Sequence, residues 1–263
     1  TKTVVAKTGG GPNGAALGPD GACYLCNNGG FRFIEDEHGL RPFQQAEDYS
    51  GGRIERVDLA TGAVTELYRD STNGPLKGPN DLVFDAHDGF YFTDLGKVRP
   101  REWDRGAVHY AKADGSFITE VVFPAITPNG VGLSPDGKTL YVAETEPGRL
   151  WAWDILAPGV LRKDGYPSPH GGRLVAGVGG YQRFDSLAVD GGGNICVATL
   201  VNGGVTVIAP DGSSVRHIPM PDRMTTNICF GGPDLRTAFL TLSLGGRLVS
   251  TPWERPGLRL NWT

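Results

Sequence analysis

Apolar and polar residues alternate along short stretches of the chain, and this alternation recurs five times. Each copy has one polar residue with apolar residues two and four positions later, as Leu82 and Phe84 follow Asn80. A period of two predicts a half-buried β-strand. A turn of Gly, Pro and Asp then leads into a second strand-like run. The five copies are PNGAALGPDGACYLC from Pro12, PNDLVFDAHDGFYFTD from Pro79, PNGVGLSPDGKTLYVAET from Pro128, FDSLAVDGGGNICVAT from Phe184 and TTNICFGGPDLRTAFLT from Thr225.

Further strand patterns lie between the copies, such as GGRIERVDLATGAVTELY and GAVHYAKADGSFITEVVF, each centred on a Thr-Gly or Asp-Gly hairpin turn. Each unit is therefore predicted to contain two hairpins, or four strands. Repeats of four strands predict the blades of a β-propeller. We predict one all-β domain over residues 1–263. The stretch Phe31–Tyr49 interrupts the pattern and is expected to be a loop insertion over one face.

Composition and charge narrow the range of partners. The chain has 263 residues with Gly 40 and Pro 19, which suits many tight turns between short strands. The net charge is −4, and no Lys/Arg cluster resembles a nucleic-acid footprint. No apolar run approaches the ~18 residues that cross a bilayer. We therefore expect neither nucleic acid nor membrane as a partner, and the oligomeric state stays open.

Four cysteines bear on the compartment. Cys23 and Cys26 form a C-x-x-C pattern, but it lies in a strand-like run and no second pair completes a zinc site. Cys23 and Cys196 follow turns at matching places in their repeats, as small apolar residues would. We expect free thiols in a reducing, cytoplasmic compartment.

The leading polar residues of the repeats are candidates for chemistry. In a propeller the innermost strand of each blade lines a central channel, so residues at matching positions converge on one ring. Amide and carboxylate oxygens there suit Ca²⁺, Mg²⁺ or Mn²⁺. Asn and Asp also cap turns, and from the spacing alone both interpretations stand. The leading residues are Asn13, Asn80, Asn129, Asp185 and Thr226.

Longer stretches resemble the SMP-30/gluconolactonase/luciferin-regenerating family of six-bladed propellers. The resemblance covers nearly the whole chain and is carried by GPND at Gly78–Asp81, TPNGVGLSPDGKTLYVAET at Thr127–Thr145, RFDSLAVD at Arg183–Asp190 and FGGPDLRTAFLT at Phe230–Thr241. It implies a divalent cation in the channel, Ca²⁺ foremost, with Zn²⁺, Mg²⁺ or Mn²⁺ as alternatives. The metal ligands that it implies in this chain are Asn80, Asn129 and Asp185.

The family's first blade contributes one more ligand, a Glu in a Glu-Gly-Pro motif, and this sequence has no such motif. The opening TKTVVAKTGG resembles the last strand of that blade. We therefore expect a propeller of the six-bladed type with an incomplete first blade. Without the Glu, divalent binding should be weaker because the site has one negative charge fewer.

The resemblance also implies an activity, hydrolysis of a lactone and most simply of a sugar lactone. The metal would act as a Lewis acid and Asp185 as the general base for water. Asp81 is expected to orient its neighbour or a water molecule, with a turn cap as the alternative. Asn13, Asn27, Asp81 and Trp103 are expected to contact the small-molecule substrate, with packing as the alternative role of Trp103.

Three other functions stay open at this point. The first is another esterase or a phosphotriesterase that uses the same site. The second is a condensing enzyme like strictosidine synthase, which needs a catalytic Glu that we do not find at a leading position. The third is a propeller without catalysis that binds a small molecule or a protein partner. A serine hydrolase is disfavoured because neither Ser134 nor Ser186 lies in a G-x-S-x-G motif.

Overall fold

The computed structural model describes residues 2–37 and 39–263. Within these ranges the chain forms β-strands joined by turns and loops, and no helix occurs. Five antiparallel sheets hold most of the strands. The prediction of an all-β chain is confirmed.

The first two sheets follow the predicted two-hairpin plan. The first has the order β1 (Pro12–Leu17), β2 (Cys23–Asn27), β5 (Arg53–Val57) and β6 (Val64–Tyr68). The second contains β9 (Pro79–Phe84), β10 (Gly89–Asp94), β11 (Gly106–Lys112) and β12 (Ile118–Ala125) in chain order. Two strands of two residues each, β7 (Asp70–Ser71) and β8 (Gly74–Pro75), pair with each other and lie between these sheets in the sequence.

The remaining sheets hold the C-terminal half. The third contains β13 (Pro128–Leu133), β14 (Thr139–Glu144) and β15 (Arg149–Ala157), and β15 also pairs with β16 (Val160–Leu161) and β17 (Arg173–Gly177). The fourth contains β18 (Arg183–Val189), β19 (Ile195–Leu200), β20 (Gly204–Ile208) and β21 (Val215–Pro219). The fifth contains β22 (Thr225–Gly231), β23 (Thr237–Leu242) and β24 (Arg247–Pro252).

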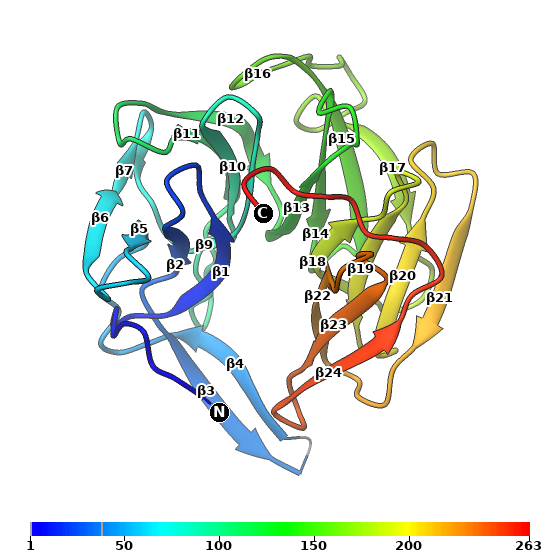
Figure 1. Cartoon of the computed structure of the whole chain (residues 1–263), viewed down its shortest axis with the longest axis horizontal. Coiled ribbons are helices and arrows are strands. Elements are labelled where there is room, and N and C mark those ends of the chain that lie inside the picture. The colour runs from blue at the N-terminus through cyan, green and yellow to red at the C-terminus, as the bar shows by residue number, and fades with distance from the viewer. Residues whose placement is uncertain (1, 38) are drawn as a thin grey trace.

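The sheets are the blades of a propeller. The first strand of each blade is the innermost, and these strands pack in the order β1, β9, β13, β18 and β22 around the centre. Figure 1 shows the blades arranged in this order, with the ring open between β1 and β22. The five leading strands predicted from the repeats are therefore the five inner strands of the fold.

Apolar side chains fill the spaces between neighbouring blades. Phe84 and Phe90 of the second blade pack against Tyr24 of the first, with ring centroids of Tyr24 and Phe84 5.0 Å apart. Val83, on the opposite side of the same strand, joins Val131 in the next interface. Alternate residues of an inner strand thus serve two different interfaces, which explains why these strands show a period of two.

The fifth blade departs from the predicted four strands, because β22, β23 and β24 are its only strands among the described residues. The chain beyond β24 instead crosses the centre of the ring as the irregular red segment of Figure 1. Leu258 donates its backbone N–H to the carbonyl of Val189 at 2.9 Å. The Asn261 side chain donates to the carbonyl of Phe84 at 3.0 Å. This tail links the fourth and second blades.

Two expectations about the N-terminal part are wrong. Residues 2–11 form no strand, and Val4 is 76% exposed, because the segment has no neighbouring strand with which to pair. The insertion is not an irregular loop, since it contains the hairpin of β3 (Phe31–Asp36) and β4 (Gly39–Gln45). Figure 1 shows this hairpin projecting beside the opening of the ring.

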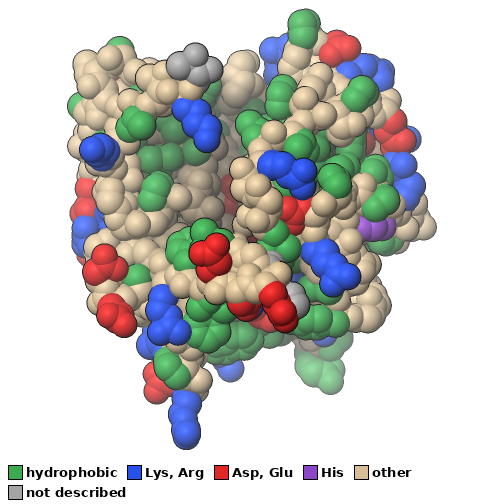
Figure 2. All heavy atoms as spheres, turned by 90° about the horizontal axis from the view of Figure 1, so that it is seen from below, with side chains coloured by type: hydrophobic (Ala, Val, Ile, Leu, Met, Phe, Trp, Pro, Cys, Tyr) green, Lys and Arg blue, Asp and Glu red, His purple; other side chains and the backbone are tan. Residues whose placement is uncertain are grey.

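The face seen in Figure 2 carries mixed charges, and the cysteines form no disulfide. Within the described ranges, the structure has no helix of the length and apolarity that a membrane crossing requires. On the face seen in Figure 2, acidic and basic side chains are interspersed without a single-sign patch. The four cysteines are free thiols, with Cys26 and Cys196 buried and Cys229 exposed.

Candidate metal and active site

Each inner strand carries an irregularity at the same place. The register between the inner strand and its neighbour shifts next to the leading polar residue in all five blades. A bulge of this kind redirects a side chain. Asn80, Asn129 and Asp185 all lie inside strands, so the turn-cap interpretation of these three residues is wrong.

Two glycines allow the inner strands to approach one another. A Cβ atom on Gly130 would lie 2.6 Å from the backbone N of Leu187 and 2.8 Å from the carbonyl O of Asp185. A Cβ atom on Gly14 would lie 2.4 Å from the carbonyl O of Asn80. The Gly of Pro-Asn-Gly is therefore needed for close strand contact. This contact places Asn129 beside Asp185.

Asn129 is fixed at both its backbone and its side chain. Its carbonyl accepts a hydrogen bond from Thr93 Oγ1 at 2.6 Å, and its Nδ2 donates to Thr145 Oγ1 at 3.0 Å. The residue is only 5% exposed. Its Oδ1 is buried and has no hydrogen-bond partner among the described residues. A buried acceptor without a partner costs free energy, so this oxygen fits a cation ligand.

Two carboxylates share this centre. Burial raises the pKa of the Asp185 carboxyl to about 7, and the charge of Asp81 contributes to the increase, whereas the Asn129 amide and the Arg183 guanidinium oppose it. Burial likewise raises the pKa of Asp81 to about 6, against hydrogen bonds from the Leu82 backbone and the Ser186 side chain. The centre thus concentrates negative charge that a cation would stabilise.

The oxygen donors suit a hard cation. Among residues 2–37 and 39–263, no three His, Cys, Asp or Glu side chains are grouped as a metal site of those ligands would need. The candidate donors are the carboxylate of Asp185 and the amides of Asn80 and Asn129, with Asn80 buried at the matching position of the adjacent inner strand. Oxygen donors without nitrogen or sulfur favour Ca²⁺ over Zn²⁺.

Two buried acids that the repeat pattern did not single out shape the approach to the donors. Asp94, at the end of β10, accepts backbone N–H bonds from Lys77 at 2.7 Å, Gly78 at 2.7 Å and Gly96 at 2.9 Å. These bonds hold the loop that enters β9 just before Asn80. The two acids occupy matching places, because Asp94 pairs with Pro79 as Glu144 pairs with Pro128. An acid at the end of the second strand in two repeats is the sequence signal that could have identified them.

Glu144 does the same for Asn129. It accepts the N–H of Ile126 at 2.6 Å and the indole N–H of Trp151 at 2.7 Å. Thr127, which follows Ile126 in the sequence, has a φ of 48°. This conformation is uncommon for a β-branched residue, so the surrounding structure must enforce it. The entry to Asn129 is therefore held rigidly.

The residues expected to contact substrate occupy different environments. Asn13 is exposed on β1. Asn27 is fully buried, and its Oδ1 accepts from Gly11 at 2.9 Å and Gly29 at 3.0 Å, while its Nδ2 donates to Gly9 and Glu55. This bonding does not favour a substrate contact for Asn27. Trp103 is 50% exposed, on the loop that follows β10 at the end of the blade where Asn80 lies.

A buried lysine at the base of the β3–β4 hairpin was also missed. Lys97 is 1% exposed, and its Nζ donates to the Gly30 carbonyl at 3.0 Å and to Asn28 Oδ1 at 3.2 Å. The Nζ lies 3.6 Å from the centroid of the Phe31 ring. Burial lowers the pKa of Lys97 to about 7. This lysine anchors the hairpin to the loop that carries Trp103.

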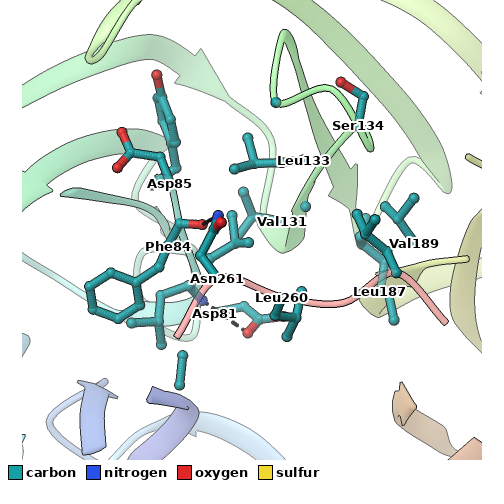
Figure 3. A pocket seen from close by; sticks show the side chains of 18 of the residues that line it. Asp81, Phe84, Asp85, Val131, Leu133, Ser134, Leu187, Val189, Leu260 and Asn261 are labelled. Atoms are coloured by element: carbon teal, nitrogen blue, oxygen red, sulfur yellow. Dashed lines mark hydrogen bonds between the residues drawn. The ribbon is translucent and has the colours of Figure 1, made fainter. Parts of the chain in front are cut away.

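A cavity with a volume of about 900 Å³ extends along the centre of the ring. Figure 3 shows Asp81 at its wall, with Val131, Leu187 and Leu260 contributing apolar surface. Asn13 also lines it, whereas Asn80, Asn129 and Asp185 do not. Asp81 therefore connects the candidate site to the cavity.

The fold and the polar centre define a β-propeller with a candidate cation site at the converging inner strands. Residues 1–243 match the SMP-30/Gluconolactonase/LRE-like region, and the chain belongs to this family.

Curated relatives include two proteins named lactonase drp35. The protein from Staphylococcus saprophyticus is 37% identical over 212 residues, which cover 81% of this chain and 57% of the relative. The protein from Staphylococcus haemolyticus is 30% identical over 217 residues, with the same two shares. The chain thus spans little more than half the length of these relatives.

Solved structures support the fold. A gluconolactonase from Xanthomonas campestris aligns with a TM-score of 0.69 and 26% identity, covering 95% of this chain and 74% of that one. A calcium-binding regucalcin from Agrobacterium tumefaciens aligns with a TM-score of 0.65 over 95% of this chain and 94% of that one. At 20% identity, the second similarity concerns the fold alone.

Proposed function

We propose that this chain carries the site of a lactonase-type hydrolase that opens a lactone ring with the help of a divalent cation. The observation that carries the proposal is the buried Oδ1 of Asn129, which has no partner among the described residues, on a side chain whose amide lies within hydrogen-bonding reach of the Asp185 carboxylate. The names of the relatives support the class of reaction. A lactone of a sugar acid is the substrate that the gluconolactonase similarity favours.

Asn80, Asn129 and Asp185 would hold the cation, with Ca²⁺ foremost. Two amides and one carboxylate leave the ion with part of its positive charge, because amides are neutral donors. When bound, the cation would polarise the lactone carbonyl and stabilise negative charge that develops on its oxygen.

Asp185 is the proposed general base. Its carboxylate takes a proton from a water molecule whose oxygen forms a bond to the carbonyl carbon. The ring C–O bond then breaks, and the proton passes from Asp185 to the departing ring oxygen, which leaves a hydroxy acid. In the cation-free chain burial raises the pKa of this carboxyl to about 7, and a cation bound beside it would lower that pKa and keep the carboxylate ionised at neutral pH.

Asp81 supports the base through its charge. The negative charge of Asp81 raises the pKa of Asp185 and so strengthens it as a base. Asp81 also lines the cavity beside the site. We propose that it orients water or substrate there, and that Asn13 and Trp103 contact the substrate at the margins.

Hydrolysis in a pH-stat tests the proposal. The protein, stripped with EDTA and then supplied with Ca²⁺, Mg²⁺ or Mn²⁺, is offered a sugar lactone, an aromatic lactone and a phosphotriester. We expect lactone opening that depends on the added ion and that Asp185→Ala abolishes. Turnover of the phosphotriester alone would favour a phosphotriesterase over a lactonase. If the ion-loaded protein turned over none of the three substrates, the proposal of a hydrolase would be refuted.

A further inference from the structure

An arginine lies close to Asp185, the one acid among the proposed cation ligands. Arg183 precedes Asp185 by two residues on β18, a separation of about 7 Å along an extended strand. The positive charge of Arg183 acts on this carboxyl, because it opposes the rise in the pKa of Asp185. A guanidinium within reach of a poorly solvated carboxylate is expected to bond to it with two parallel N–H groups. Such bonds would occupy the oxygens that a cation needs.

The Arg183 side chain bonds to Glu146 instead. Its Nη2 donates to Glu146 Oε1, and this is the only ion pair that Arg183 makes among the residues described. The Nε of Arg183 is buried and has no hydrogen-bond partner in the same part of the chain. The guanidinium therefore has an unused donor and a second acid nearby, and a different bonding arrangement is open to it.

We infer that Glu146 is a positioning residue that holds Arg183 away from Asp185 and so keeps this carboxylate open to the proposed cation. The inference rests on the function proposed above and concerns the same site. Glu146 contacts neither cation nor substrate in this scheme, since it acts only through Arg183. Without Glu146, the guanidinium would turn to Asp185 and compete with the cation for the same oxygens.

The backbone places Glu146 where this task requires it. Glu146 lies in the turn between β14 and β15, and its N–H donates to Thr127 Oγ1 at 2.9 Å. The turn packs against the residue before Arg183, because a Cβ atom on Gly148 would lie 2.7 Å from the carbonyl O of Gln182. The third blade thus presents an acid to the arginine of the fourth. The side chains of Arg183 and Glu146 are 31% and 32% exposed, so tight packing does not lock the pair in place.

Isothermal titration of EDTA-stripped protein with Ca²⁺ at pH 8 tests the inference without any substrate. We expect Glu146→Ala to weaken Ca²⁺ binding by about tenfold, the effect of one charge-assisted hydrogen bond to Asp185 that the cation must displace. Glu146→Gln keeps a neutral acceptor for Arg183 and should lie between this variant and wild type. The matched control is Glu102→Ala, which removes an acid that pairs with Arg99 at 3.6 Å on the loop after β10, and it should change the affinity by less than about twofold.

A second substitution separates this mechanism from a simple loss of negative charge near the site. Arg183→Met should raise the Ca²⁺ affinity by less than about threefold in otherwise wild-type protein, where Glu146 holds the arginine. In the Glu146→Ala background it should raise the affinity by about tenfold, because it removes the competitor. Equal effects of Arg183→Met in the two backgrounds would overturn the inference, since the two charges would then act independently.

Crystals of EDTA-treated Glu146→Ala locate the arginine directly. We expect a guanidinium nitrogen of Arg183 about 2.8 Å from the Asp185 carboxylate, and an arginine that stays away from it would overturn the inference. Urea unfolding in EDTA shows whether each variant folds, and Glu146→Gln replaces the alanine variant in the cycle if that variant does not. Unchanged Ca²⁺ affinity of folded Glu146→Ala would overturn the inference alone. Absence of Ca²⁺ binding by wild type would overturn the proposed function together with the inference.

Discussion

Replacing Asp185 by Asn should stabilise the cation-free protein, and more so as the pH rises. The pKa of Asp185 is about 7 in the folded chain, against an ordinary value of 3.8. Because the folded state holds this proton more tightly than the unfolded state, stability from this group is complete at low pH. It is lost as the pH rises from about 4 to about 7.

The size of the effect follows from the same two pKa values. A difference of about three pH units corresponds to roughly 4 kcal/mol, which is an upper bound for an isolated group. Asp185 is partly exposed, so solvent screening reduces this figure, and we expect about 2 kcal/mol. The stability gap between Asp185→Asn and wild type should therefore widen by about 2 kcal/mol between pH 4.5 and pH 8.

Urea unfolding in EDTA at pH 4.5, 6 and 8 measures this gap directly. Asp48→Asn, which removes an exposed carboxylate on the loop after β4, is the control and should show a small gap at every pH. Saturating Ca²⁺ should reverse the order at pH 8, because only wild type keeps the charged ligand. A gap that does not change with pH, or that narrows as the pH rises, would refute the placement at the centre of a desolvated carboxylate with a raised pKa.

Three further predictions concern other parts of the structure. Asp94→Ala should lower the free energy of unfolding by about 3 kcal/mol, because three loop N–H groups lose their acceptor. Asp94→Asn keeps one acceptor oxygen and should lower it by less. Equal losses for the two variants in urea unfolding would contradict this. Asp81→Asn should lower the pKa of Asp185 and shift the rising limb of the pH–rate profile to lower pH, and an upward shift would argue against charge coupling. Truncation after Gly257 should cost about 2 kcal/mol and Asn261→Ala about 1 kcal/mol in thermal unfolding, and unchanged melting would mean that the tail contributes no stability.

The repeat pattern was enough to predict the inner strands and to bring Asn129 and Asp185 to one centre. It worked because each inner strand packs against two neighbours, which imposes a strict alternation. The β3–β4 hairpin escaped this logic. Its side chains are largely exposed on both faces, so burial imposes no period on its sequence.

The roles of single polar residues were harder to predict. Asn27 belongs to the same register as Asp94 and Glu144, and its Oδ1 accepts the N–H groups of Gly11 and Gly29 just as Asp94 accepts those of Gly78 and Gly96. A sequence shows which residues share a register but not the direction in which neighbouring loops point their N–H groups. The bulge at Asn129 could not be predicted either. Pro-Asn-Gly is typical of turns, and the triplet alone does not show that it lies inside a strand.

The central claim is that Asn80, Asn129 and Asp185 hold one divalent cation. An anomalous difference map from a crystal soaked in Ca²⁺ tests it most directly. We predict a single strong peak about 2.4 Å from Oδ1 of both asparagines and from the carboxylate of Asp185. A peak elsewhere in the ring, or none at this centre in crystals that remain ordered, would contradict the account.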